Sequence, residues 1–106
     1  MTRESWSTEE LAVLGTMCFC SIYRRYVSSV KDIALTAFGR SDSLAKSRVN
    51  RVLAKLRSKG WLFIDQASHR EYGARMQYGL RCNVEKEVLD LLDDHDLPEL
   101  PLKLSE

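Results

Sequence analysis

Residues 41–66 read SDSLAKSRVNRVLAKLRSKGWLFIDQ, and this stretch decides how the chain folds. Apolar residues recur in its first part three and four positions apart, which is the spacing of one face of an α-helix. These residues are Ala45, Val49, Val52, Leu53 and Leu56. Gly60 follows as the residue that ends a helix, with Arg57 and Lys59 in the last turn before it. The pattern predicts an amphipathic helix over residues 43–58.

The face opposite this apolar stripe is small and polar. Its centre carries Ser43, Ser47, Asn50, Arg51 and Ala54, and its flanks carry Lys46, Arg48 and Lys55. Small side chains let a helix enter the major groove of DNA, Asn and Arg bind base edges, and flanking cations bind phosphates. We therefore expect base contacts from the two serines, Asn50 and Arg51, and backbone contacts from the flanks. An ordinary solvated helix face explains the composition of this helix equally well.

A β-hairpin is expected directly after this helix. The apolar run 61–64 is typical of a strand, and from Arg75 onward apolar and polar residues alternate as on a second strand. The alternation places Met76, Tyr78, Leu80 and Cys82 on one face. A polar segment, residues 67–74, joins the two strands. The hairpin is thus predicted over residues 61–82.

At this point the chain resembles the winged helix-turn-helix superfamily and, more loosely, its MarR-like regulators. The matching residues are the helix 44–58, the turn 59–62 and the strand, tip and strand over 63–83. The resemblance implies an α+β, mainly α fold with a three-helix core, a β-hairpin wing and a C-terminal helix. It also implies that the wing lies along a minor groove, where Arg70 at the apex and then Arg75 contact DNA.

Charge is segregated along the chain. Residues 24–82 carry thirteen Lys and Arg against four Asp and Glu, a net charge of +9, whereas residues 1–23 carry −2 and residues 83–106 carry −6. The positive block coincides with the predicted helix-turn-helix and wing, so a basic face that binds polyphosphate is expected. Scattered solvated cations are the alternative explanation.

Length and composition are those of a single soluble domain. The chain has 106 residues, of which 44% are hydrophobic and 29% charged. It contains neither an 18-residue apolar run nor an N-terminal signal pattern, so a cytoplasmic, nucleoid-associated protein without membrane contact is expected. Its three cysteines suit a reducing compartment.

Neither a metal site nor an active site is expected. Cys18 and Cys20 lie two positions apart, so on a helix their side chains point in nearly opposite directions and cannot share one ion. His69 and His95 lack ligand spacing. The sequence shows no set of nucleophile, base and oxyanion donors and no glycine-rich phosphate loop, so neither a cofactor nor catalysis is predicted.

The first helix, predicted over residues 7–26, is apolar nearly all round. Ser7 and Glu10 form a capping box at its start, and no charge follows until Arg24. One face should meet the core and the other a second subunit, which predicts a homodimer. The expected interface residues are Leu11, Leu14, Met17, Cys18, Phe19 and Ile22. A central helix wrapped wholly by its own chain is the alternative.

Two further helices and a tail complete the chain. A helix over 30–38 begins after Ser29, and in the turn that follows it Arg40 is expected to reach a phosphate. A last helix over 84–94 precedes an acidic, leucine-containing tail over 97–106. The leucines of the tail could pack on the first helix or on a partner subunit, form a docking peptide, or stay disordered.

These patterns predict a small homodimeric regulator of transcription, or a plasmid or phage control protein, that binds a pseudo-palindromic duplex. The alternative is a winged-helix module that binds proteins within a larger complex, because this fold does not fix function. In that case the apolar first helix and the acidic C-terminal segment would carry the activity. RNA binding through the basic face is a third possibility.

Overall fold

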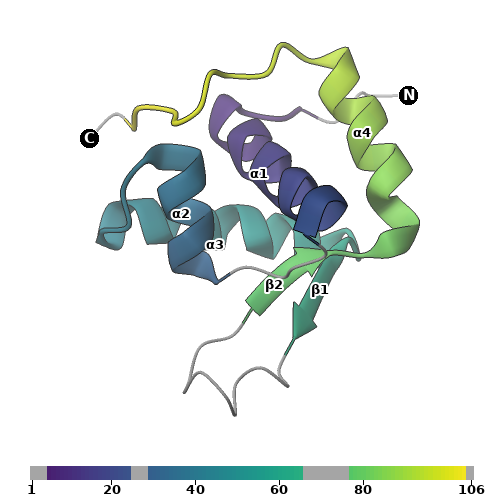
Figure 1. Cartoon of the computed structure of the whole chain (residues 1–106), viewed down its shortest axis with the longest axis horizontal. Coiled ribbons are helices and arrows are strands. Elements are labelled where there is room, and N and C mark those ends of the chain that lie inside the picture. Colours follow the sequence, from purple (N-terminus) through teal and green to yellow (C-terminus); the bar gives the residue numbers. More distant parts are fainter. Residues whose placement is uncertain (1–4, 25–28, 66–76, 105–106) are drawn as a thin grey trace.

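The structure is a computed structural model that describes residues 5–24, 29–65 and 77–104. Over these residues the fold is α+β and mainly α, as predicted (Figure 1). The elements are α1 (Thr8–Arg24), α2 (Val30–Phe38), α3 (Ser43–Ser58), β1 (Leu62–Asp65), β2 (Gln77–Leu80), the 3-10 turn η2 (Cys82–Val84) and α4 (Glu85–Asp94). No helix in the described ranges is both long and apolar enough to cross a membrane.

Helix α1 lies in the middle of the molecule. Helices α2, α3 and α4 and strand β2 all contact it, and Figure 1 shows α2 and α4 on opposite sides of it. The largest fully buried side chains come from four different helices and form one continuous core. They include Val13, Leu14, Ile33, Val49, Leu56 and Val88.

Each of the first three helices begins at a side-chain cap. Ser7 and Glu10 form the predicted capping box, in which the Ser7 N–H donates to Glu10 Oε1 at 2.8 Å and the Glu10 N–H donates to Ser7 Oγ at 3.2 Å. Ser29 Oγ accepts from the Asp32 N–H at 3.2 Å and thereby caps α2. Asp42 caps α3 in the same way, through the Ala45 N–H at 3.0 Å.

Helix α3 spans the predicted range, and its five predicted apolar residues are its buried residues. Gly60 ends it at φ +77°, a left-handed conformation that glycine adopts without strain. The Gly60 N–H donates to Arg57 O at 3.0 Å and the Trp61 N–H to Leu56 O at 2.9 Å, which is the Schellman arrangement. Strand β1 therefore starts at Leu62, directly after this turn.

The two strands form the antiparallel pair that the sequence predicts. Leu62 pairs with Leu80 and Asp65 with Gln77, and the Arg81 N–H extends the ladder by donating to Trp61 O at 2.9 Å. Leu62 and Leu80 face the core and are buried. The tip that joins the strands, with the predicted contacts Arg70 and Arg75, lies outside the described residues.

The predicted dimer interface on α1 is wrong for the four of its residues whose side chains the structure describes. The exposed fractions of Leu11, Leu14, Met17 and Cys18 are 5%, 0%, 3% and 3%. Helices α2, α3 and α4 and strand β2 cover them, so α1 is apolar all round because its own chain surrounds it. The side chains of Phe19 and Ile22, the remaining two predicted contacts, lie outside the described residues. Residues 25–26, at the predicted end of this helix, also lie outside them.

The C-terminal tail packs on the chain's own helix α2. The Leu102 N–H donates to Ala37 O at 2.7 Å, and Leu102 and Leu104 are half-buried against the core. Pro101 lies against Gly39, the residue that ends α2 at φ +70°. In Figure 1 the tail runs from α4 across the top of the molecule toward α2. The predicted packing of the tail leucines on the first helix is therefore met only in part: Leu97 and Leu100 border a groove that is also lined by α1, whereas Leu102 is hydrogen-bonded to α2.

Candidate nucleic-acid interface

The exposed face of α3 presents the residues predicted to read bases. Ser43, Ser47, Asn50 and Arg51 are all exposed. The buried stripe on the opposite side fixes the rotation of the helix, so these four side chains point away from the core. Within the described parts of the chain, the Asn50 and Arg51 side chains make no hydrogen bond and no ion pair. Their donors and acceptors are free to meet a ligand.

One flank of this face carries unpaired cations. Lys46 and Arg57 lie on the same edge of the helix as Asn50, because they are four and seven positions away from it. Both are exposed and have no ion-pair partner among the residues that the structure describes. This edge, which we call the open flank (Lys46 and Arg57), places two positive charges beside the amide of Asn50.

The other flank is already neutralised by α1, contrary to the expectation that its cations are free for phosphates. Arg48 Nη1 lies 3.3 Å from Glu9 Oε2, and Lys55 Nζ lies 2.8 Å from Glu10 Oε2. Lys55 Nζ also donates to Ser5 O at 3.0 Å. We call this edge the paired flank (Arg48 and Lys55).

Two tryptophans adjoin the paired flank, and their contact was not predicted from the sequence. The rings of Trp6 and Trp61 stack with centroids 5.8 Å apart and planes inclined by 13°. Lys55 Nζ lies 4.0 Å from the Trp6 ring centroid, and Lys59 Nζ lies 4.6 Å from that of Trp61. No spacing pattern in the sequence predicts this cluster, because its residues come from the N-terminal segment and from the region around the C-terminal end of α3.

The charge environment lowers the pKa of Glu10. Burial of this carboxyl group raises its pKa, but hydrogen bonds from Lys55 and from Ser7 favour the charged form and outweigh burial. Glu10 is therefore ionised at neutral pH and pairs with Lys55 as a full negative charge.

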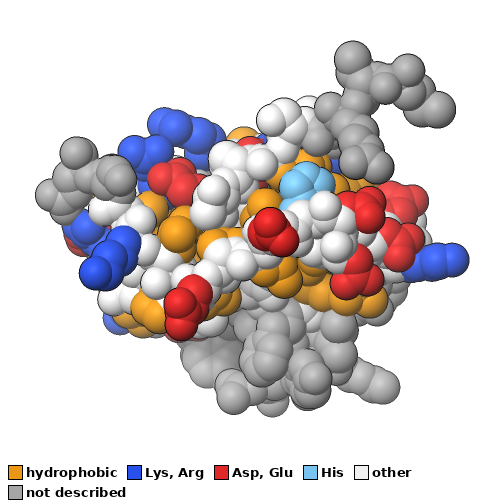
Figure 2. Space-filling model, turned by 90° about the horizontal axis from the view of Figure 1, so that it is seen from above, with side chains coloured by type: hydrophobic (Ala, Val, Ile, Leu, Met, Phe, Trp, Pro, Cys, Tyr) orange, Lys and Arg blue, Asp and Glu red, His pale blue; other side chains and the backbone are white. Residues whose placement is uncertain are grey.

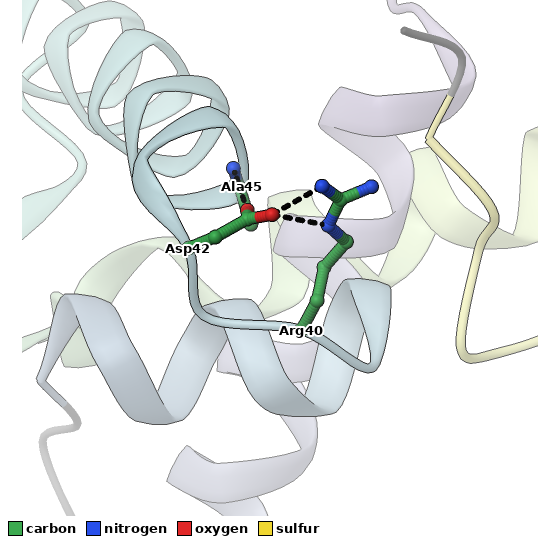
Figure 3. Close-up of polar contacts among 3 residues, drawn as sticks. All are labelled: Arg40, Asp42 and Ala45. Carbon is green, nitrogen blue, oxygen red and sulfur yellow. Dashed lines mark hydrogen bonds and ion pairs between the residues drawn. The ribbon is translucent and has the colours of Figure 1, made fainter.

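Arg40 is engaged within the turn before α3, although it was predicted to bind phosphate. Its guanidinium donates to Asp42 Oδ2 through Nε at 2.8 Å and through Nη2 (Figure 3). The other oxygen of Asp42 caps α3. The hydrogen bonds from Arg40 and from the Ala45 N–H together hold the pKa of Asp42 below its usual value of 3.8. Arg40 thus fixes the helix start in the free protein.

Helix α4 carries a separate group of exposed acidic side chains. Helix α4 exposes Glu87, Asp90, Asp93 and Asp94. Figure 2 shows a group of acidic side chains on the right of the view, and lysines and arginines mainly on the left, where further acidic side chains lie among them. On the face shown, the charges of opposite sign are thus separated only in part.

An apolar groove of about 350 Å³ lies between α1, α2 and the tail. Among the described residues its lining includes Leu11, Gly15, Thr36, Leu97 and Leu100, and none of the described lining residues is charged. The groove therefore lacks the cations that a nucleic acid requires, and we place no nucleic-acid contact there.

The chemistry available on α3 is that of polyanion recognition: exposed amide and guanidinium groups at the centre, cations on the flanks, and a rigid core behind. Within residues 5–24, 29–65 and 77–104 no three His, Cys, Asp or Glu side chains lie together as a metal site would require, and Cys18 is buried. No family model matches the chain, and neither the curated proteins nor the solved structures include a significant match.

Proposed function

We propose that this protein binds double-stranded DNA sequence-specifically, as a small transcriptional regulator or a plasmid or phage control protein. The observation that carries the proposal is the exposed, unengaged face of α3, with Asn50 and Arg51 at its centre. A helix that offers these side chains from a rigid support matches the donor and acceptor pattern of base edges in the major groove.

The order of elements supports a winged helix as the scaffold. Three helices precede an antiparallel strand pair, and the pair begins directly after the Schellman turn of α3. In such a scaffold α3 occupies the major groove while the hairpin tip follows the backbone into the adjacent minor groove. We assign Arg70 and Arg75 at that tip to minor-groove contacts.

Each part of α3 takes a separate role in this proposal. Asn50 and Arg51 bind base edges, helped by Ser43 and Ser47, and the open flank binds phosphates through Lys46 and Arg57. Phosphate contacts fix the position of the protein on the duplex, whereas base contacts determine which DNA sequence it binds.

A homodimer remains our proposal for the assembled state, with two α3 helices about 34 Å apart on a pseudo-palindromic site. Leu11, Leu14, Met17 and Cys18 do not form its interface, since the domain buries them itself. Light scattering coupled to size exclusion measures the mass, and a monomer both free and on DNA would contradict the dimer.

The test is selection of bound genomic fragments, followed by binding titrations on the selected duplex over a salt series. Asn50→Ala and Arg51→Ala should each cost about 1–3 kcal/mol on that duplex and little on a scrambled one. Lys46→Ala should weaken both duplexes alike and reduce the slope of log K against log salt by about 0.9.

Lys86→Ala is the matched control, because Lys86 is an exposed cation on the acidic helix α4. It should leave the affinity for both duplexes nearly unchanged. The proposal fails if no duplex binds, if binding is independent of salt, or if Lys86→Ala and Arg51→Ala have equal effects.

A protein-interaction module is the second candidate function, and one observation favours it. Leu89 on α4 is 42% exposed between acidic neighbours, which suits a basic amphipathic partner. The apolar residues of α1 were also predicted to bind a protein partner, but those whose side chains the structure describes are buried and cannot do so. This candidate would be favoured if the native chain captured a protein and bound no DNA, and if Leu89→Asp abolished the capture.

A further inference from the structure

The N-terminal segment Ser5–Glu10, which we call the strap, lies along the paired flank of α3. Three polar contacts join it to α3: Glu9 to Arg48 at 3.3 Å, Glu10 to Lys55 at 2.8 Å, and Ser5 O to Lys55 at 3.0 Å. Both carboxylates lie in the first turn of α1. The strap thus brings two negative charges to the two cations of one edge of the helix.

The strap is anchored independently of these ion pairs. Trp6 is only 8% exposed and stacks on Trp61 at the root of the hairpin. The capping box between Ser7 and Glu10 fixes the start of α1. The carboxylates are consequently held in place by the fold, and removing their charge does not remove the strap.

The ion pairs themselves are open to solvent. The exposed fractions of the Arg48 and Glu9 side chains are 28% and 30%, and those of Lys55 and Glu10 are 27% and 20%. Pairs that are partly exposed in this way contribute a modest net free energy, since water and salt compete for both charges. A phosphate oxygen is the same kind of acceptor as a carboxylate oxygen, at the same distance from Arg and Lys.

We propose that the paired flank is a second phosphate-binding surface, which Glu9 and Glu10 occupy in the free protein and which duplex DNA takes over by exchanging phosphate for carboxylate. This inference rests on the proposed function. Of the two flanks of α3, the open flank has cations without an ion-pair partner among the described residues, whereas the paired flank does not. In the complex both flanks contact the backbone. The strap therefore lowers the affinity for any duplex and leaves the base contacts unchanged.

The double variant Glu9→Gln, Glu10→Gln tests the exchange in the full chain. Glutamine at position 10 still accepts from the Ser7 N–H, so the capping box and the fold are retained. Affinity for the selected duplex should rise by about two- to thirty-fold, since two exposed ion pairs no longer oppose binding. The slope of log K against log salt should steepen by up to about 2, because two more cations release counterions.

The matched control is Glu87→Gln, Asp90→Asn, which removes two exposed carboxylates from α4 and changes the net charge equally. Any gain from net charge alone appears in both variants. The inference is upheld if the strap variant gains more than this control, and it is overturned if the two bind with equal affinity and equal slope. If neither the native chain nor the strap variant binds duplex DNA, or if only RNA binds, the proposed function itself fails.

Tryptophan fluorescence gives a second reading that does not depend on affinity. Both tryptophans of the chain belong to the stack, and Lys55 Nζ lies 4.0 Å from the Trp6 ring centroid. Withdrawal of Lys55 to a phosphate should change the emission when duplex is added. The change should be largely lost in Lys55→Met. An equal change in Lys55→Met would contradict the exchange.

Discussion

Asp42 performs two tasks with one carboxylate. Oδ1 caps α3 by accepting from the Ala45 N–H, and Oδ2 accepts from Arg40 across the turn (Figure 3). Both contacts favour the charged form, which explains the lowered pKa. A single exposed residue thus fixes where the proposed recognition helix begins and holds the turn that joins it to α2.

Acid should weaken the fold through this residue. Because the pKa of Asp42 is lower in the folded state than its usual value of 3.8, its contribution is full above that value and is lost as the pH falls through the lowered pKa. Asp42→Asn keeps a capping oxygen but lacks the charge. Urea unfolding between pH 2.5 and pH 7 should show a smaller acid-dependent loss of stability for the variant. Parallel pH profiles for the two proteins would contradict this assignment.

Local contacts were predictable at the residue scale, and long-range ones were not. The Ser7–Glu10 capping box and the Ser29 cap follow from residues three positions apart, and both are confirmed. The ion pairs of Glu9 and Glu10 with α3 depend on how α1 crosses it, which no local spacing encodes. For this reason the paired flank was predicted as a set of free cations.

At the scale of elements, α1 shows the limit of periodicity as a guide. A helix without a polar face needs cover on every side, but the pattern does not say whether the same chain or a second one supplies it. Here α2, α3, α4 and β2 surround it. In contrast, α3 has a clear apolar stripe, and its buried face and bounds were both predicted correctly.

Truncating α1 should therefore cost folding stability at any protein concentration. Leu14 is fully buried, so Leu14→Ala should lower the free energy of unfolding by about 2–5 kcal/mol. The loss should be equal at low and high protein concentration in urea titrations, because an intramolecular contact does not depend on a partner. Leu89→Ala, at a site 42% exposed, is the control and should change stability by less than about 0.5 kcal/mol. A loss for Leu14→Ala that shrinks at high concentration would restore the interface hypothesis.

At the scale of the whole molecule, the tail links the acidic helix α4 to helix α2. It passes from α4 over the domain and donates a backbone hydrogen bond to Ala37, two residues before the Gly39 turn. The leucine pattern of this segment was visible in the sequence. Its docking site was not, because the groove it borders arises only when α1 and α2 pack together.

Breaking the contact of the tail with α2 should destabilise the domain. Leu102→Asp places a charge against the apolar surface that Leu102 now covers, so the free energy of unfolding should fall by about 1–3 kcal/mol. Lys103→Asp, at the exposed neighbouring position, introduces the same side chain into solvent and should have little effect. Urea midpoints for the two variants measure the difference. Equal midpoints would show that the tail adds no stability through Leu102.

Trp61 bonds to both elements that meet at the Gly60 turn: its N–H donates to Leu56 O at the end of α3, and its O accepts from the Arg81 N–H next to the first residue of β1. Because this one residue is hydrogen-bonded to both, we expect α3 and the strand pair to keep a fixed distance and orientation relative to each other. If the proposed function is correct, a duplex whose grooves do not match this spacing must bend or change its groove width to bind both elements. DNA deformability would then contribute to target selection at base pairs that no side chain touches.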